Sequence, residues 1–481
     1  MIRMSVRRRV WGAAVPAMIF LCLLVFAVPS EDTVLVRIEK TDAERIPVEM
    51  EADILIVQEL RTSLIAVVPS SRWDGLAGLG ISGKVLDGDA DGKAYFLVYT
   101  PRPGDPDVLK KFGTAVSLDE RTCLFWSGAA EAREILPSVF KIKRLWLDRQ
   151  IAWSRPGKAV AEPPEARADV LSDPWITGWV AKVAKVNLTA SIQSLQNFKS
   201  RYTSTGTCQS AGTYLYNRFI QMGLSCSYEP FTFSRSSIST RNVIARLPGK
   251  KYPGQVVIVC AHYDSISDRP VLLAPGADDN ASGTAAVLEI ARVLAGKSFE
   301  YTVKFICFSA EEWGLYGSEN YARRAKNRGE KIVGVINMDM VSYTDATRKK
   351  LEIYVNSSSN WLGSKFIQTA ATYAPLPIAK YVDGSADWSD HWSFWDYGFY
   401  ALCGIESAAD WNPYYHRTTD TLDKLNLNFC VSVTKASLAT VAVLAKPYTA
   451  TAALSGPEAW SPNAGFFPAV SRGTAAISKE P

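Results

Sequence analysis

The chain has 481 residues, of which 47% are hydrophobic, and its formal net charge is +5. This length and composition predict a globular protein with a main domain and a smaller companion, because the chain is too long for one small core. Four of the positive charges are arginines within the first nine residues, so the remaining chain carries only +1. This balance argues against nucleic acid or a membrane surface as a partner.

Residues 1–30 have the three parts of a secretory signal. A basic start is followed by an apolar stretch from Val10 to Val28, then by small residues, and no acid occurs before Glu31. This order predicts a signal peptide, so we expect a secreted or periplasmic protein without stable membrane contact after cleavage. An uncleaved anchor is the alternative, because the apolar stretch is just long enough to cross a bilayer.

Residues 31–153 contain an internal repeat. The segment ELRTSL at 59–64 recurs as DERTCL at 119–124, and each copy leads through an apolar strand into a helix-like segment. The region has no cluster of histidines or acids. It is predicted to be a small, duplicated α+β prodomain or docking domain, with an ordinary structural appendage as the alternative.

A linker at 154–169, rich in proline, alanine and charge, follows and would be a natural site for proteolysis. Residues 170–449 are predicted to form the catalytic domain, and the Ala-, Ser-, Gly- and Pro-rich residues 450–481 a disordered tail. Strands are expected at 231–234 and 242–247. Helices are expected at 175–186, 188–202, 210–223, after Ser282, after Gly314, at 361–373 and at 429–445.

Seven cysteines follow the predicted signal. Oxidation could pair Cys208 with Cys226, which flank a helix-like segment. That helix would be about 20 Å long at about 1.5 Å per residue, whereas the Cα atoms of a disulfide lie within about 7 Å. We therefore do not expect this bridge.

Three apolar, β-branched runs, at 256–261, 303–309 and 332–338, are each followed by polar residues. They predict three buried parallel strands, and hence an α/β fold with a predominantly parallel central sheet flanked by helices. Open sheets of this kind build their sites in the crevice outside the carboxyl ends of the strands. The residues that follow the three runs are His262 and Asp264, Glu311 and Glu312, and Asp339.

Two of the three histidines, His262 and His416, stand beside acids in the motifs HYD and HRTTD. Unpaired buried carboxylates at strand ends would be costly, and a metal would remove that cost. Oxygen and imidazole ligands without thiolates suit zinc. Asp279, Glu312 and Asp339 carry three negative charges, which two divalent ions and a bridging hydroxide would balance, so the count favours two metals.

The motifs HYD, APGADDNASG, SAEEWGLYGS, NMDM and YYHRTTDTLD occur in this order between about residue 170 and residue 446. Together they resemble the co-catalytic dizinc aminopeptidases of the bacterial leucyl aminopeptidase family, whose relatives include glutaminyl cyclases and glutamate carboxypeptidases. The resemblance does not cover the repeat region or the tail. It implies that His262 and Asp339 hold one zinc, that Glu312 and His416 hold the other, and that Asp279 bridges them.

The resemblance also implies roles for residues that are not ligands. Glu311 would be the general base, Asp264 would orient the ring of His262, and the peptide bond after Asp279 would be cis. In some relatives a tyrosine shortly before the SDH motif stabilises the oxyanion, whereas this chain has Ala386 or Trp388 there. His391 in SDHW is a further candidate beside the site. The aromatic stretch 388–400 either lines a substrate pocket or belongs to the core.

From these motifs we expect a secreted zinc exopeptidase that hydrolyses N-terminal residues from peptides. The alternatives are a glutaminyl cyclase-like enzyme, a carboxypeptidase-type enzyme, and a non-catalytic ectodomain on the same scaffold. A non-catalytic module should have lost ligands, and all five expected ligands are present here. The sequence gives no indication of the oligomeric state.

Overall fold

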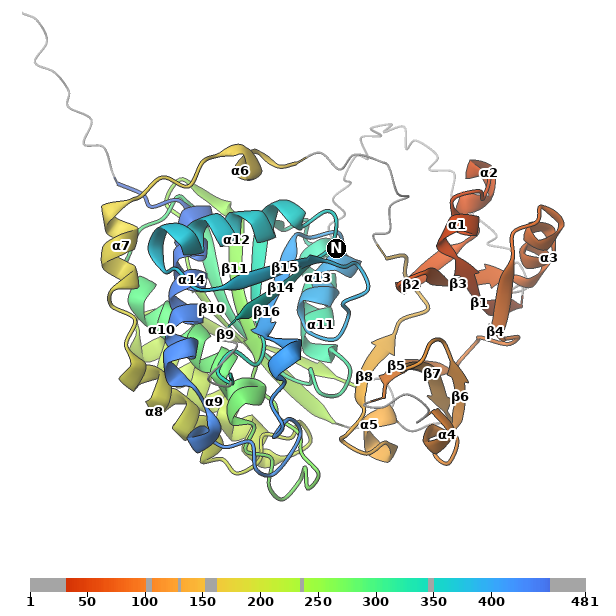
Figure 1. Cartoon of the computed structure of the whole chain (residues 1–481), viewed down its shortest axis with the longest axis horizontal. Helices are drawn as coiled ribbons and strands as arrows, with labels where there is room; N and C mark the ends of the chain where they lie inside the picture. The colour runs from red at the N-terminus through yellow and green to blue at the C-terminus, as the bar shows by residue number, and fades with distance from the viewer. Residues whose placement is uncertain are drawn as a thin grey trace, which may run out of the picture.

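The computed structural model describes residues 32–100, 106–128, 131–151, 162–233, 238–344 and 350–449. The predicted signal peptide at 1–30 and the predicted tail at 450–481 lie outside these residues. The described chain forms two small β lobes followed by a large α/β domain (Figure 1).

Each lobe is built on a four-stranded antiparallel sheet. The strand order is β2-β3-β1-β4 in the first lobe and β6-β7-β5-β8 in the second, so the two sheets have the same topology. In the second lobe β8 therefore lies at an edge. The first lobe has β1 Thr33–Glu39, α1 Lys40–Ala43, α2 Val48–Glu51, β2 Leu55–Glu59, β3 Ser63–Pro69, α3 Ser70–Gly78 and β4 Gly83–Asp87. The second has β5 Ala94–Tyr99, α4 Pro106–Leu109, β6 Thr114–Ser117, β7 Thr122–Ser127, α5 Ala132–Ile135 and β8 Lys141–Leu145.

The large domain is organised around an eight-stranded sheet of order β15-β14-β16-β13-β11-β12-β10-β9. Its four central strands, β16, β13, β11 and β12, are parallel to one another, which confirms the predicted sheet. The strands are β9 Ser225–Thr232, β10 Ser239–Leu247, β11 Tyr252–His262, β12 Tyr301–Phe308, β13 Lys331–Met338, β14 Leu351–Val355, β15 Ile378–Val382 and β16 Ala401–Glu406.

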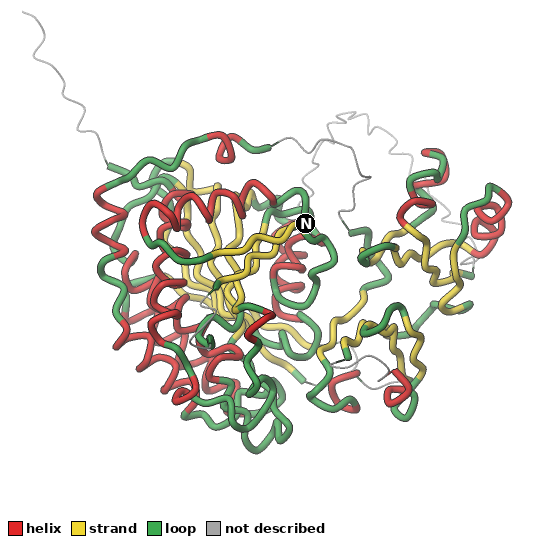
Figure 2. Tube along the Cα trace, in the orientation of Figure 1, coloured by secondary structure: helices red, strands yellow, loops and turns green. Residues whose placement is uncertain are grey.

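Helices cover both faces of this sheet, and Figure 2 shows its strands in yellow among the red helices. One face packs against α7 Pro174–Val180, α8 Lys185–Gln196, α9 Gly206–Gln221, α10 Gly283–Leu294, α12 Asn360–Tyr373 and α14 Leu427–Ala445. The other face packs against α11 Tyr316–Asn327 and α13 His391–Asp396. The short helix α6 Pro164–Arg167 precedes the domain.

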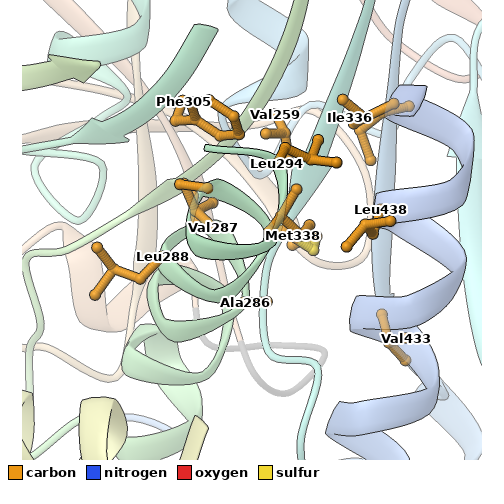
Figure 3. Packing of buried hydrophobic residues seen from close by; sticks show 14 of the residues in the cluster. Val259, Ala286, Val287, Leu288, Leu294, Phe305, Ile336, Met338, Val433 and Leu438 are labelled. Atoms are coloured by element: carbon orange, nitrogen blue, oxygen red, sulfur yellow. The ribbon is translucent and has the colours of Figure 1, made fainter. Parts of the chain in front are cut away.

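Strand β11 separates two hydrophobic cores. Its Val259 faces the core that holds α10 and α14, whereas its Ile258 faces the core of α11 and α13. Figure 3 shows residues of the first core, among them Val259 of β11, Val287 of α10 and Leu438 of α14. Because both faces of the strand are covered, its sequence is continuously apolar.

Helix α14 is, within the part of the chain that the structure describes, the one helix long and apolar enough to span a membrane. However, 67% of its apolar window is buried inside the fold, where it packs on α10, α12 and β11. We therefore describe it as a core helix.

Cys208 and Cys226 are unpaired, as are the other five cysteines of the described residues. The aromatic stretch 388–400 belongs mainly to the core, because Trp392, Phe394 and Trp395 are buried against the sheet.

Candidate metal centre

The site lies where neighbouring parallel strands end. His262 is the last residue of β11, and Asp339 directly follows β13, which pairs with β11. The glutamates at 311 and 312 follow β12, the other neighbour of β11. Asp279 comes from the turn Ala277–Ser282 before α10, and His416 from the segment after β16.

Asp279 lies between the two histidines. Its Oδ1 is 3.3 Å from Nε2 of His262, and its Oδ2 is 3.2 Å from Nε2 of His416. Each histidine has a second carboxylate beside the same nitrogen. Asp339 Oδ1 is 3.2 Å from His262 Nε2, and Glu312 Oε2 is 3.1 Å from His416 Nε2. The five predicted ligands therefore form two groups that share Asp279.

These distances fit zinc. Ligand atoms around a tetrahedral zinc ion, bonded at about 2.0–2.1 Å, lie about 3.3 Å apart, close to the separations above. Both carboxylate oxygens of Asp279 and of Glu312, and Nε2 of His416, are buried without a hydrogen-bond partner. Buried polar atoms without partners are costly, and metal ligation would satisfy all five.

Glu311 differs from these residues. Its Oε2 is 3.9 Å from Nε2 of His262, farther than any of the carboxylate oxygens above. Burial raises the pKa of Glu311 well above its usual value, and Lys141 and His262 only partly oppose this. Burial also favours a raised pKa for Asp279, but the neighbouring rings of His262 and His416 hold that pKa well below its usual range. Asp279 thus stays ionised, whereas Glu311 is suited to carry a proton.

A family model described as peptidase family M28 matches residues 242–441, which include all of these residues. The chain is 30% identical over 298 residues to a probable leucine aminopeptidase of Arthroderma otae, which covers 59% of this chain and 77% of that protein. The chain belongs to peptidase family M28. It is a zinc-dependent metallo-aminopeptidase and therefore acts on peptides.

Two further comparisons support the family and the fold. A probable leucine aminopeptidase of Trichophyton verrucosum is 33% identical over 264 residues, which covers 52% of this chain and 68% of that protein. The crystal structure of the LapA aminopeptidase of Legionella pneumophila matches with a TM-score of 0.58 at 18% identity. That match covers 87% of this chain and all of LapA, so the likeness in fold extends beyond the catalytic domain.

In this M28 peptidase, Asp264 contacts more than His262. Nδ1 of His262 donates to the main-chain oxygen of Asp264 at 3.2 Å, and the carboxylate is 3.6 Å from the same nitrogen. The carboxylate accepts the main-chain N–H of Glu311 and of Glu312, both at 3.2 Å, and the hydroxyl of Thr203 at 3.0 Å. Asp264 therefore positions the two glutamates as well as the histidine.

Two residues beside the ligands were not singled out from the sequence. Asp420 accepts the main-chain N–H groups of Asp278, at 3.0 Å, and of Asp279, at 3.1 Å. Ser389 donates to Asp339 Oδ2 at 2.7 Å. Both residues belong to motifs that the sequence analysis quotes, because Asp420 is the final acid of HRTTD and Ser389 is the serine of SDH. The peptide bond between Asp279 and Asn280 is cis, as the resemblance implies.

His391 lies outside both ligand groups. Its Nε2 contacts the main-chain oxygen of Ala386 at 2.7 Å, and the ring packs between Trp388 and Trp395. Burial lowers the pKa of His391 to about 3, so it is neutral near pH 7. His391 is therefore a core residue that supports the loop before Ser389.

Tyr415 is a further residue that the sequence did not indicate. Its ring stacks on His416 with 3.7 Å between the ring centroids. Burial raises the pKa of Tyr415 well above its usual value, and the charges of Asp279, Glu312 and Glu311 add to this. A neutral phenol, able to donate a hydrogen bond, therefore lies beside the ligand cluster.

The second lobe also reaches the site of the peptidase. Lys141, at the start of β8, places Nζ 2.7 Å from Oε1 of Glu311. The main-chain oxygen of Ser138 is 2.7 Å from Nδ1 of His416, where it accepts the ring N–H. That hydrogen bond leaves Nε2 as the unprotonated nitrogen that faces the carboxylates.

Proposed function

We propose that this peptidase removes N-terminal residues from peptides with two zinc ions and with Glu311 as general base. The proposal rests mainly on the position of Asp279. One oxygen of its carboxylate lies near His262 and the other lies near His416. A carboxylate in that position can bridge two ions, as the charge count also favours. The alternative cyclase and carboxypeptidase activities have no such specific support.

Zinc bound by these groups would supply Lewis acidity, which lowers the pKa of water and polarises the scissile carbonyl. Glu311 would accept the proton of the attacking water and return it to the leaving amine. The raised pKa of its buried carboxyl suits both steps. Asp264 would keep Glu311 in place through the hydrogen bond from its main-chain N–H.

We expect an apolar first residue in the substrate. Met340, next to the ligand Asp339, belongs to a small apolar cluster with Cys403 and Ile405, against which Tyr415 and Trp388 pack. The names of the similar fungal proteins, leucine aminopeptidases, agree with such a preference. The signal-like residues 1–30 support export, so peptides outside the cytoplasm are the proposed substrates.

The zinc content tests the proposed metal set. Purified active enzyme should contain about two zinc ions per chain, because Asp279 lies between His262, which is close to Asp339, and His416, which is close to Glu312. Chelation should abolish hydrolysis of leucine p-nitroanilide, and added zinc should restore it. Elemental analysis that finds one ion or none on fully active enzyme would contradict the two-metal assignment. N-terminal glutaminyl peptides in the same assay would detect cyclase activity.

We assign oxyanion stabilisation to Tyr415, because this chain has Ala386 or Trp388 where some relatives have a tyrosine. Tyr415→Phe should lower kcat by about 10²-fold, the usual loss for one oxyanion donor, with zinc content and KM nearly unchanged. Tyr414→Phe is the matched control, since that ring pairs with Tyr343 instead. A Tyr415→Phe enzyme with normal kcat would exclude this role.

A further inference from the structure

We propose that residues 131–145 of the second lobe are an internal inhibitor, in which the ammonium of Lys141 holds Glu311 in an ion pair. The inference rests on the proposed function of Glu311 as general base. It assigns the regulation of the catalytic site to one named contact between the N-terminal lobes and the large domain.

The ion pair blocks the base directly. Lys141 Nζ lies 2.7 Å from Glu311 Oε1, the lysine side chain is only 13% exposed, and the glutamate side chain is fully buried. A carboxylate that accepts a charge-assisted hydrogen bond from an ammonium is not free to take a proton from water. The ammonium of Lys141 is also the functional group of a free peptide N-terminus. Lys141 therefore competes with the substrate for the site around Glu311.

Hydrogen bonds to main-chain oxygens hold the segment against the loop that follows β12. Arg133 Nε donates to the main-chain oxygen of Glu312 at 2.8 Å, on the strand end that carries the base. The N–H of Arg144 donates to the oxygen of Gly314 at 3.3 Å. Gly314 permits this approach, because its φ is +117° and a Cβ there would lie 2.8 Å from the nitrogen of Arg144.

Both lobes are anchored at Asp387, in the loop before Ser389. Its carboxylate accepts the hydroxyl of Tyr99 and, at 2.7 Å, the amide of Gln58 from the first lobe. Lys143 Nζ lies 3.5 Å from the same carboxylate and 3.6 Å from the ring centre of Trp392. Lys141 and Lys143 are two residues apart on β8, so both ammonium groups point into the large domain.

Two features favour a displaceable inhibitor over a permanent part of the site. Three hydrophobic clusters consist only of lobe residues, and Trp146 packs against a fourth cluster that belongs to the large domain. A pocket of about 680 Å³ lies between residues 133–139 and the large domain, with Tyr202, Asp268 and Trp313 in its wall. Residues 133–139 thus line one side of this pocket and do not fill it. Its attachment to the full chain gives it a high effective concentration at the site.

The first test compares the zinc-loaded full chain with its Lys141→Met variant on leucine p-nitroanilide. Freeing the base should raise kcat/KM by about 10²-fold, within the range that general acid–base catalysis contributes. Lys110→Met, on an exposed lysine of the same lobe that pairs with Asp107, should leave kcat/KM unchanged. If Lys141→Met does not fold by circular dichroism, Lys141→Gln replaces it.

A second readout does not require turnover. Lys141→Met should bind leucine hydroxamate at least about tenfold more tightly than wild type by calorimetry, because the competing ammonium is gone. Equal hydroxamate affinity and equal kcat/KM for wild type and variant would overturn the inhibitor. If hydroxamate affinity rises but no form of the protein hydrolyses substrate, the proposed function fails while the inhibitor stands. If Glu311→Gln keeps full turnover, the base assignment fails instead.

Discussion

Glu311→Gln should lower kcat by about 10²–10⁴-fold while both zinc ions stay bound and KM changes little. The reason is the distance described above, since Glu311 Oε2 is 3.9 Å from His262 Nε2 and the ligand carboxylates lie at 3.1–3.3 Å. Glutamine keeps the size of the side chain but cannot accept a proton from water. Zinc content by elemental analysis, together with kcat and KM, checks this result.

Glu312→Gln is the matched control on the neighbouring residue. Glu312 Oε2 is 3.1 Å from His416 Nε2, and both of its oxygens are buried without a hydrogen-bond partner. We expect this variant to lose zinc and to regain part of its activity when zinc is added. Zinc loss by Glu311→Gln with retention by Glu312→Gln would reverse the two roles. Near-normal turnover by both variants would place the catalytic site elsewhere.

Arg201→Met should destabilise the large domain by about 3–5 kcal/mol, because four buried carbonyl groups would lose a charged donor. Nε of Arg201 donates to Tyr263, Nη1 to Leu195 and Pro275, and Nη2 to Gly276, at 2.6–3.2 Å. The arginine is fully buried. Its contacts join the end of α8 to both sides of the loop between His262 and Asp279.

Urea unfolding followed by tryptophan fluorescence and by circular dichroism measures this loss. Arg328→Met is the control, because that side chain is 51% exposed at the end of α11, and its effect should stay within about 0.5 kcal/mol. Similar midpoints for Arg201→Met and wild type would show that water or other donors satisfy the four carbonyls. The zinc content of the folded Arg201→Met protein would report whether the loop still carries the ligands.

The large sheet could be predicted because its signals are local. The run 256–261 is continuously apolar since both faces of β11 are covered, and the acids that follow 303–309 and 332–338 mark strand ends. The strands β14, β15 and β16 were not predicted individually. The ligand roles stay a prediction from the resemblance, which the distances around Asp279 support.

The contacts around Glu311 could not be predicted, because they join distant parts of the chain. Lys141 and Glu311 are 170 positions apart, and nothing in the sequence KIKRL distinguishes a lysine that reaches a catalytic site from one on the surface. The carboxylate of Asp264 is a similar case, since its hydrogen bonds to Glu311 and Glu312 appear only when β11 and β12 pair. Tyr415 was adjacent to a predicted ligand, but its orientation depends on the stacked ring of His416.

The position of β8 at the edge of its sheet bears on whether activation can be reversed. Its pairing within the lobe is with β5, and its other edge faces the large domain, where Arg144 donates to Gly314. Release of the lobe would open this edge and expose unpaired N–H and C=O groups, which readily pair with other chains. A detached lobe would therefore be lost to self-association or degradation before it could bind again, and the enzyme would be switched on only once.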